Sequence, residues 1–159
     1  MIQIYTGDGH GKSPAALGKA VLSACEGKSV VIIQFLKGKT FENKSFLARL
    51  EPEIKIFRFE KSECNFCELS EAEKKEEIAN IKNGLHYAKK VLAIDECDVL
   101  ILDEVLGLVD YGIITAEQLK EILDCRSERV DVIMTGIQMS EEVLALADEV
   151  SKIESVSFK

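Results

Sequence analysis

Short apolar runs alternate along the chain with segments whose apolar residues recur every three or four positions. The apolar runs predict strands, and the three-to-four spacing predicts amphipathic helices. The run at 29–35 is continuous rather than alternating, which is typical of a strand buried on both faces of a parallel sheet. The repeated strand, loop, helix order predicts a three-layer α/β domain of about five or six mainly parallel strands with right-handed crossovers. Further strands are predicted from residue 2 and over 54–59, 98–104, 130–134 and 150–158.

Capping residues mark where the predicted helices begin and end. A capping box at Ser70–Glu73 opens a long helix that ends near Ala93, and a second box at Thr115–Gln118 opens another helix. Gly27 is suited to end the helix that follows the first strand, because glycine readily adopts the left-handed conformation. Shorter helices are predicted over 45–50 and 140–147.

The first strand runs into a glycine-rich turn and then a helix, which is the order of elements in a phosphate-binding loop. Glycines alternate at positions 7, 9 and 11, so the backbone N–H groups are open to a bound anion. Lys12 supplies a charge for the β and γ phosphates, and the Ser13 hydroxyl can reach Mg²⁺. Thr6 stands where the strict P-loop pattern has its first glycine, so the literal motif fails by one position. The predicted phosphate-binding residues are Gly7, Asp8, Gly9, His10, Gly11, Lys12, Ser13 and Pro14, and the alternative is a glycine-rich turn that binds no ligand.

Two adjacent acids, Asp103 and Glu104, end the apolar strand 98–104, as in a Walker B motif. A carboxylate at the carboxyl end of a buried parallel strand, beside the strand of the phosphate loop, can hold Mg²⁺ directly or through water. The predicted metal ligands are therefore Ser13, Asp103 and Glu104, and the predicted catalytic residues are Lys12 and Glu104. The alternative is that the two acids only cap the following helix.

Composition limits the classes of function. The 159 residues fit one domain, predicted to span 1–159, and 47% hydrophobic residues are enough for a substantial core. A formal charge of -8 argues against broad nucleic-acid binding and favours small anionic ligands. Within that charge, the run 71–77 is predicted to be the solvated face of the long helix. No apolar run reaches the ~18 residues of a membrane span. Because residue 1 leads into a core strand rather than a signal peptide, a cytoplasmic location is predicted.

Cysteines and two loops leave several interpretations open. The five cysteines form an odd, scattered set, which indicates a reducing compartment. Cys64 and Cys67 have the spacing of a metal or redox pair, but no second Cys or His pair follows at zinc-site spacing, so incidental thiols are the third alternative. The lysines of loop 36–44 either contact a ligand at the carboxyl end of a strand or are solvated. The aperiodic segment 60–69 is either a substrate loop or a connector.

With these landmarks in place, the sequence resembles the P-loop family of ATP:corrinoid adenosyltransferases, which adenosylate cob(I)alamin or cob(I)yrinic acid a,c-diamide. The resemblance extends over nearly the whole chain. Its first block is 5–16, which stands in the frame of the family's Tyr-Thr-Gly-Asn/Asp-Gly-Lys-Gly-Lys-Thr-Thr-Ala-Ala. The other blocks are Gln34–Gly38, then Leu102–Glu104 with Tyr111 and Gly112, then Thr135 and Gly136 with Glu141, Glu142, Ala147 and Asp148.

The resemblance implies a specific reaction, in which a Co(I) corrinoid attacks the ribose C5′ of ATP and the whole triphosphate departs. It implies that the loop N–H groups, Lys12 and a Mg²⁺ held by Ser13 and Glu104 neutralise the departing charge, while Asp103 orients the water shell of the metal. No general base is required, because the nucleophile carries no proton.

The resemblance also implies a corrinoid site and partners. Family members use apolar and aromatic side chains to remove the lower axial ligand of the corrinoid, and residues 57–67 correspond to that segment. Phe57 and Phe66 are the candidate corrinoid contacts; the family's tryptophan is missing here, and Phe66 or Cys67 stands near its position. The implied partners are ATP, Mg²⁺, a reduced corrinoid, a reductase and a second copy in a homodimer, without nucleic acid or membrane.

Three functions stay open at this point. The first is a corrinoid adenosyltransferase, in the synthesis or salvage of cobalamin. The second is another P-loop enzyme that hydrolyses ATP or transfers its γ-phosphate. The third is a nucleotide-binding or regulatory module without catalysis. Their products from ATP and a reduced corrinoid separate them.

Overall fold

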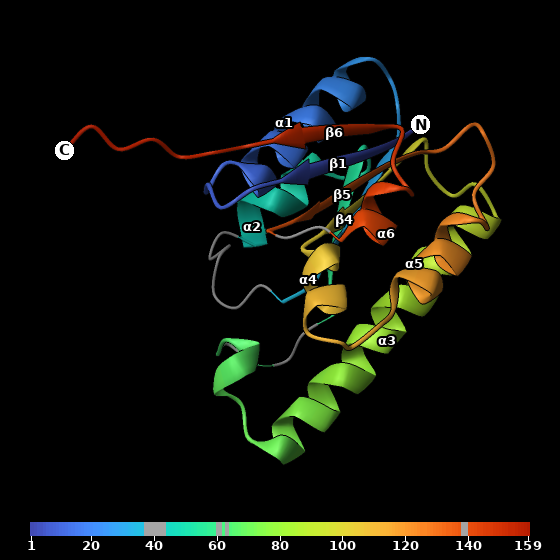
Figure 1. Ribbon diagram of the computed structural model, residues 1–159. Coiled ribbons are helices and arrows are strands. Elements are labelled where there is room, and N and C mark those ends of the chain that lie inside the picture. The colour runs from blue at the N-terminus through green and yellow to red at the C-terminus, as the bar shows by residue number, and fades with distance from the viewer. Residues whose placement is uncertain (37–43, 60–61, 63, 138–139) are drawn as a thin grey trace.

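A six-stranded parallel sheet runs through the computed structural model, which describes residues 1–36, 44–59, 62, 64–137 and 140–159 (Figure 1). Its strands are β1 (Ile2–Thr6), β2 (Val30–Gln34), β3 (Ile54–Arg58), β4 (Val99–Asp103), β5 (Asp131–Gly136) and β6 (Glu149–Lys152). The spatial order is β3-β2-β4-β5-β1-β6, and all neighbouring strands are parallel. The predicted α/β fold class with a parallel sheet is thereby confirmed.

Helices cover both faces of the sheet, which gives the predicted three layers (Figure 1). On one face the small residues Ala16 and Ala20 of α1 (Lys12–Cys25) pack with Ile32, Ile101 and Ile133 of the sheet. The opposite face packs against the apolar residues of α3, α4, α5 and α6. These helices are α3 (Glu71–Ala93), α4 (Val105–Asp110), α5 (Ala116–Leu123) and α6 (Glu141–Leu144), while α2 (Lys44–Leu47) and short 3₁₀ turns at Ala48–Leu50 and Phe66–Glu68 lie in the connections.

The local signals in the sequence account for these elements. Both predicted capping boxes are formed: Ser70 N–H donates to Glu73 Oε2 at 2.8 Å, and the second box joins Thr115 to Gln118. All five residues of β2 are buried, as the continuous apolar run predicts. Because these signals act between residues close in sequence, they were readable before the fold was known.

Some predictions about the elements were wrong. α6 and β6 are shorter than the predicted helix over 140–147 and strand over 150–158. The charged run of α3 is not wholly solvated, because the side chain of Glu77 is only 6% exposed and its Oε1 accepts a hydrogen bond of 2.8 Å from Ser62 N–H. No bounds were predicted for the six-residue helix α4, since it is too short for a helical period to show.

The acid strand is not the neighbour of the phosphate-loop strand, which corrects the predicted adjacency. β5 lies between β1 and β4 in the sheet. Apolar periodicity identifies a strand and its buried face, but it does not say which strand lies beside it. The contact between the two predicted site segments therefore depends on α1, as shown below.

The cysteines are free thiols, and within the described ranges no group of three or more His, Cys, Asp or Glu side chains is placed to hold a metal. Cys64 and Cys67 are exposed, whereas burial raises the pKa of the Cys97 thiol to about 12. Lys37 and Lys39 of loop 36–44 lie outside the described residues. No helix among the residues with described positions is long and apolar enough to cross a bilayer.

Candidate nucleotide and metal site

The predicted phosphate loop connects the end of β1 to the start of α1. Gly7 has φ +120°, a conformation that residues with a side chain rarely adopt, and it lets the chain turn out of the sheet. Gly11 is the N-cap of α1 and offers no capping side chain, and the first helical turn carries no acidic residue. The first N–H groups of a 14-residue helix therefore form a site suited to an anion. Asp8, His10 and Pro14 are exposed on the outside of this turn.

Lys12 folds back over its own loop. Its ammonium Nζ donates to Gly7 O at 2.7 Å and to Gly9 O at 2.8 Å, and the residue is only 6% exposed. An ammonium has three N–H donors, so these two bonds leave one for a bound anion. The two carbonyls hold the charge of Lys12 at the centre of the glycine-rich turn.

The Gly9 amide points away from the anion cradle. Its N–H donates to Ile153 O at 3.3 Å, on the segment that follows β6. This donor is therefore used within the protein. The N–H groups at the start of α1, rather than the whole loop, are the backbone donors that face an anion.

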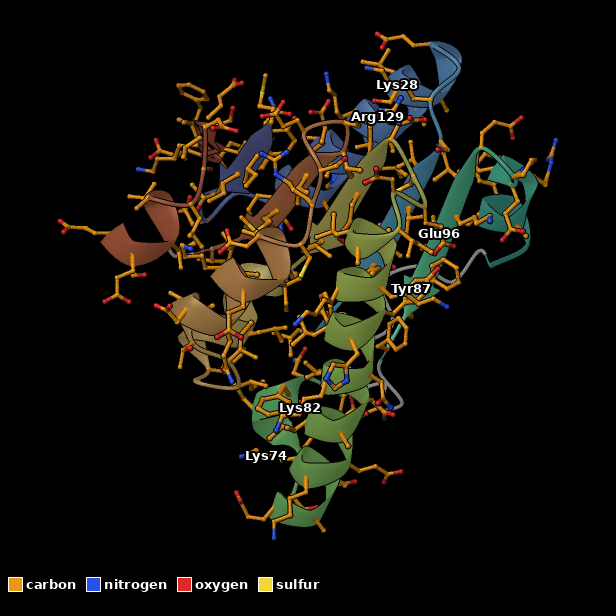
Figure 2. All side chains as sticks on the ribbon, turned by 90° about the vertical axis from the view of Figure 1, so that its right-hand side faces the viewer. Lys28, Lys74, Lys82, Tyr87, Glu96 and Arg129 are labelled. Carbon is orange, nitrogen blue, oxygen red and sulfur yellow. The ribbon has the colours of Figure 1, made fainter. Side chains whose placement is uncertain are left out.

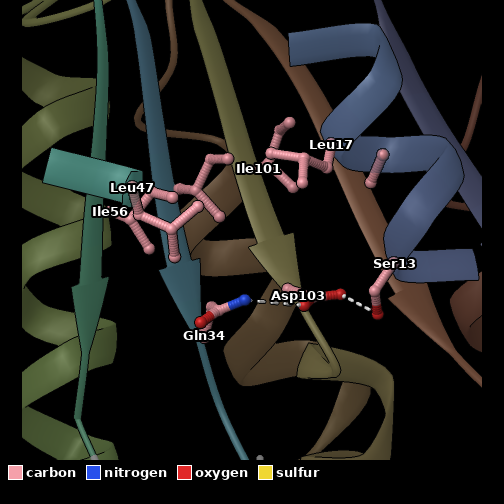
Figure 3. A pocket seen from close by; sticks show the side chains of 9 residues that line it. Ser13, Leu17, Gln34, Leu47, Ile56, Ile101 and Asp103 are labelled. Carbon is pink, nitrogen blue, oxygen red and sulfur yellow. Dashed lines mark hydrogen bonds between the residues drawn. The ribbon is translucent and has the colours of Figure 1, made fainter. Parts of the chain in front are cut away.

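Ser13 contacts Asp103 directly, although one strand, β5, lies between β1 and β4. The hydroxyl Oγ donates to Asp103 Oδ1 at 2.8 Å (Figure 3). The contact forms because α1 crosses the sheet face above β4 and β5, where the small residues Ala16 and Ala20 allow close packing. The sequence predicted both partners, and the helix brings them together.

Asp103 is held from two further directions. Thr135 Oγ1 donates to the same Oδ1 at 2.7 Å, and Gln34 Nε2 donates to Oδ2 at 3.3 Å. Arg58 Nε in turn donates to Gln34 Oε1 at 3.0 Å. The carboxylate is buried, with Asp103 2% exposed, so these hydrogen bonds fix its orientation.

Gln34 and Thr135 were not among the predicted site residues. Gln34 is the last residue of β2 and Thr135 the next to last of β5, so both lie at the carboxyl edge of the sheet with Asp103. Both also lie in the blocks that carry the family resemblance. A polar residue at the end of an otherwise apolar strand was the available signal.

Glu104 turns away from the strand that Asp103 ends. Its backbone is left-handed, with φ 61° and ψ 18°, and its N–H donates to Thr135 Oγ1 at 2.9 Å. α4 begins at the next residue, but the side chain of Glu104 makes no capping hydrogen bond to it. The structure thus joins Ser13 to Asp103, whereas Glu104 lies at the start of α4 with its N–H bonded to Thr135.

The two candidate corrinoid contacts lie in different places. Phe57 packs on the face of the sheet that α3 covers, with its ring 4.9 Å from that of Tyr87, and Figure 2 shows Tyr87 on α3. Phe66 lies 5.5 Å from the ring of exposed Tyr111, beyond the end of α4. Cys67 Sγ donates to Tyr111 Oη at 3.4 Å. The structure does not bring Phe57 and Phe66 together in one contact.

A small pocket, partly open to solvent, adjoins the Ser13–Asp103 contact (Figure 3). It lies between α1, α2 and the sheet, and its polar lining groups are those of Ser13, Gln34 and Asp103. The remaining lining residues are Ala16, Leu17, Ile32, Leu47, Ile56 and Ile101. The polar site therefore borders an apolar hollow on the α1 face of the sheet.

Comparison with known proteins gives concordant matches. Residues 1–159 match the family model described as ATP:corrinoid adenosyltransferase BtuR/CobO/CobP. A corrinoid adenosyltransferase of Escherichia coli is 30% identical over 156 residues, which covers 98% of this chain and 77% of that protein. The corrinoid adenosyltransferase CobA of Salmonella typhimurium is 31% identical over 157 residues, with 98% and 77% covered.

Solved structures with this fold include two more distant proteins. Flagellar accessory protein FlaH from Methanocaldococcus jannaschii matches with a TM-score of 0.64 at 17% identity, over 99% of this chain and 72% of that one. A KaiC-like protein from Pyrococcus horikoshii matches with a TM-score of 0.56 at 16% identity, over 99% and 74%. At such low identity these likenesses concern the fold alone.

Proposed function

Because this chain belongs to the ATP:corrinoid adenosyltransferase family, we propose that it transfers the 5′-deoxyadenosyl group of ATP to a Co(I) corrinoid and releases triphosphate. The cobalt–carbon bond forms as the C5′–O bond breaks, and the electron pair of the broken bond leaves with the triphosphate. The observation that carries the proposal is the 2.8 Å hydrogen bond between Ser13 and Asp103, because it joins the phosphate loop to the acidic end of β4.

The residues of the loop stabilise the leaving group. Negative charge develops on the oxygen that departs from C5′, so catalysis needs fixed donors and positive charge near the triphosphate. The uncapped start of α1 supplies N–H groups, and Lys12 supplies an ammonium held in place by Gly7 and Gly9. The nucleophile has no proton to lose, so no residue is assigned as a general base.

The Ser13 hydroxyl and the Asp103 carboxylate fit Mg²⁺, because both are hard oxygen ligands and they lie in direct contact. In nucleotide sites Mg²⁺ typically takes one or two carboxylates together with substrate phosphates and water. Ser13 and Asp103 would hold the ion, and Glu104, the residue that follows Asp103 in the chain, is the third proposed ligand. Bound there, Mg²⁺ would neutralise part of the triphosphate charge. Thr135 and Gln34 keep the Asp103 carboxylate turned toward that position.

Phe66 is the better supported of the two candidate corrinoid contacts. Its half-buried ring lies against exposed Tyr111, which leaves aromatic surface at the carboxyl end of the sheet. Phe57 already packs against Tyr87 and belongs to the core on the α3 side. A reductase partner, a homodimer and a cytoplasmic location stay predictions.

The products of one incubation test the proposed reaction. The purified chain, ATP, Mg²⁺ and a chemically reduced corrinoid are combined without oxygen. We expect a light-sensitive cobalt–carbon product and an equal amount of tripolyphosphate. Accumulation of ADP and phosphate with unaltered corrinoid would identify an ATP-hydrolysing or kinase-type enzyme. Unaltered ATP and corrinoid would leave a binding module, and either result overturns the proposal.

A further inference from the structure

The chain passes over its own phosphate loop directly after β6 (Figure 1). In the sheet, Lys152 is the register partner of Thr6, so the next residue leaves the sheet beside Gly7. Ile153 N–H donates to Thr6 O at 2.7 Å, and Ile153 O accepts from Gly9 N–H at 3.3 Å. Ile153 is therefore bonded both to the end of β1 and to the middle of the loop.

The three loop glycines all face this C-terminal segment. A Cβ on Gly7 would lie 2.0 Å from Ile153 O, which leaves no room for any side chain. A Cβ on Gly9 would lie 3.0 Å from Ser155 Oγ, and one on Gly11 would lie 3.0 Å from Ile153 Cγ2. The alternating glycines thus accommodate residues of the same chain.

The contact is linked to Lys12 through Gly9. The N–H of Gly9 is held by Ile153 O, while the carbonyl of Gly9 accepts one of the two hydrogen bonds from Lys12 Nζ. The other Lys12 bond goes to the carbonyl of Gly7, the residue packed most closely on Ile153. A change in the segment after β6 is therefore transmitted to the ammonium that faces the triphosphate.

We propose that Ile153–Ser155 is a positioning element of the triphosphate site. It fixes the loop in the conformation that places Lys12 and the start of α1 for the phosphates. A loop ordered before binding loses less conformational entropy when the ligand arrives, so the contact raises affinity for the triphosphate without touching it. The inference rests on the proposed function, because it concerns how that triphosphate site is kept in shape.

Two shortened chains test the role of the segment. One ends at Lys152 and lacks the segment, and its matched control ends at Ser155 and lacks only residues 156–159. We expect the first to bind MgATP at least about tenfold more weakly by calorimetry, with a raised KM for ATP and a kcat at saturation within about threefold of the full chain. The control should bind MgATP like the full chain. Equal MgATP affinity of the two shortened chains overturns the proposal.

A pair of substitutions tests the same contact without shortening the chain. Gly11→Ala places a methyl group against Ile153, and Ile153→Ala removes the group that it meets. We expect Gly11→Ala to weaken MgATP binding at least about tenfold, and the double variant to recover to within about threefold of Ile153→Ala alone. If the double variant binds MgATP no better than Gly11→Ala, MgATP itself requires Gly11. That result also overturns the proposal.

Amide exchange separates this inference from the proposed function. The hydrogen bond from Gly9 N–H to Ile153 O predicts slow exchange at Gly9 in the full chain and in the chain that ends at Ser155. Exchange at Gly9 should become fast in the chain that ends at Lys152. If the full chain binds no MgATP, the proposed function fails, and this measurement still decides whether the segment holds the loop. If exchange at Gly9 stays slow in the chain that ends at Lys152, the segment does not hold the loop and the proposal is overturned.

Discussion

Ser13 Oγ lies 2.8 Å from Asp103 Oδ1, although 90 positions separate the two residues in the sequence. Ser13 lies in the first turn of α1 and Asp103 ends β4, so the contact joins a helix start with a strand end. Both groups are oxygen ligands of the kind that Mg²⁺ prefers, and each is held in place by the helix or strand that carries it. A metal entering here would meet two ligands that need little rearrangement.

The first prediction concerns Lys12. Lys12→Ala should lower kcat/KM for ATP by about 100- to 1,000-fold, because a fixed charge beside the leaving group is lost. It should also lower the free energy of unfolding by about 1–2 kcal/mol, since the carbonyls of Gly7 and Gly9 lose their donor. Steady-state kinetics measures the change in kcat/KM, and urea unfolding measures the change in free energy. Lys19→Ala, an exposed position on the same helix, is the control and should change neither. Full activity of Lys12→Ala would refute the assignment of the phosphate loop.

The second prediction concerns the metal. Asp103→Asn keeps the size of the side chain but removes its charge, so the Mg²⁺ concentration for half-maximal activity should rise at least about tenfold. Ser13→Ala should act in the same direction. A titration of activity with Mg²⁺ at saturating ATP measures both. Asp98→Asn, at the opposite end of the same apolar run, is the control and should leave the Mg²⁺ dependence unaltered. An unchanged Mg²⁺ dependence in Asp103→Asn would remove Asp103 from the metal site.

The third prediction concerns Thr135, whose hydroxyl donates to Asp103 Oδ1 and accepts from Glu104 N–H. The residue is fully buried, so Thr135→Val should cost about 1–3 kcal/mol of unfolding free energy by leaving both groups without that partner. It should also raise the Mg²⁺ concentration for half-maximal activity, because Asp103 loses an orienting bond. Thr135→Ser keeps the hydroxyl and should retain most of both properties. If Thr135→Ser changed both properties as much as Thr135→Val, the hydroxyl of Thr135 would not be the group that orients Asp103.

The fourth prediction concerns pH. Asp98 accepts hydrogen bonds of 2.8 Å from Ser29 N–H and 2.9 Å from Ser29 Oγ, and these hold the pKa of its carboxyl below its ordinary value. A carboxyl with a lowered folded-state pKa stabilises the fold above its unfolded pKa of about 3.9, and this contribution disappears as the pH falls through the folded value. Urea midpoints of the wild type and Asp98→Asn should therefore converge as the pH falls below about 4. A constant difference from neutral pH into the acid range would contradict the assignment.

Much of the fold could be read from residues close together in the sequence. Apolar runs and helical spacing placed the strands and the long helices, and the capping boxes at Ser70 and Thr115 placed two helix starts. Candidate site residues could be named from the sequence as well. Glycines followed by Lys12 and Ser13, and two acids after an apolar strand, each use side chains whose function depends mainly on their immediate neighbours along the chain.

Only the tertiary structure decided which distant residues meet. The order of strands put β5 between β1 and β4, so it is the crossing of α1 that brings Ser13 to Asp103. The tertiary structure also made Gln34 and Thr135 partners of the Asp103 carboxylate, and it placed Ile153 against the loop glycines. Periodicity says that a side chain faces the interior, but a contact across the sheet depends on packing free energy summed over the whole domain. That sum has no signature within a single segment of sequence.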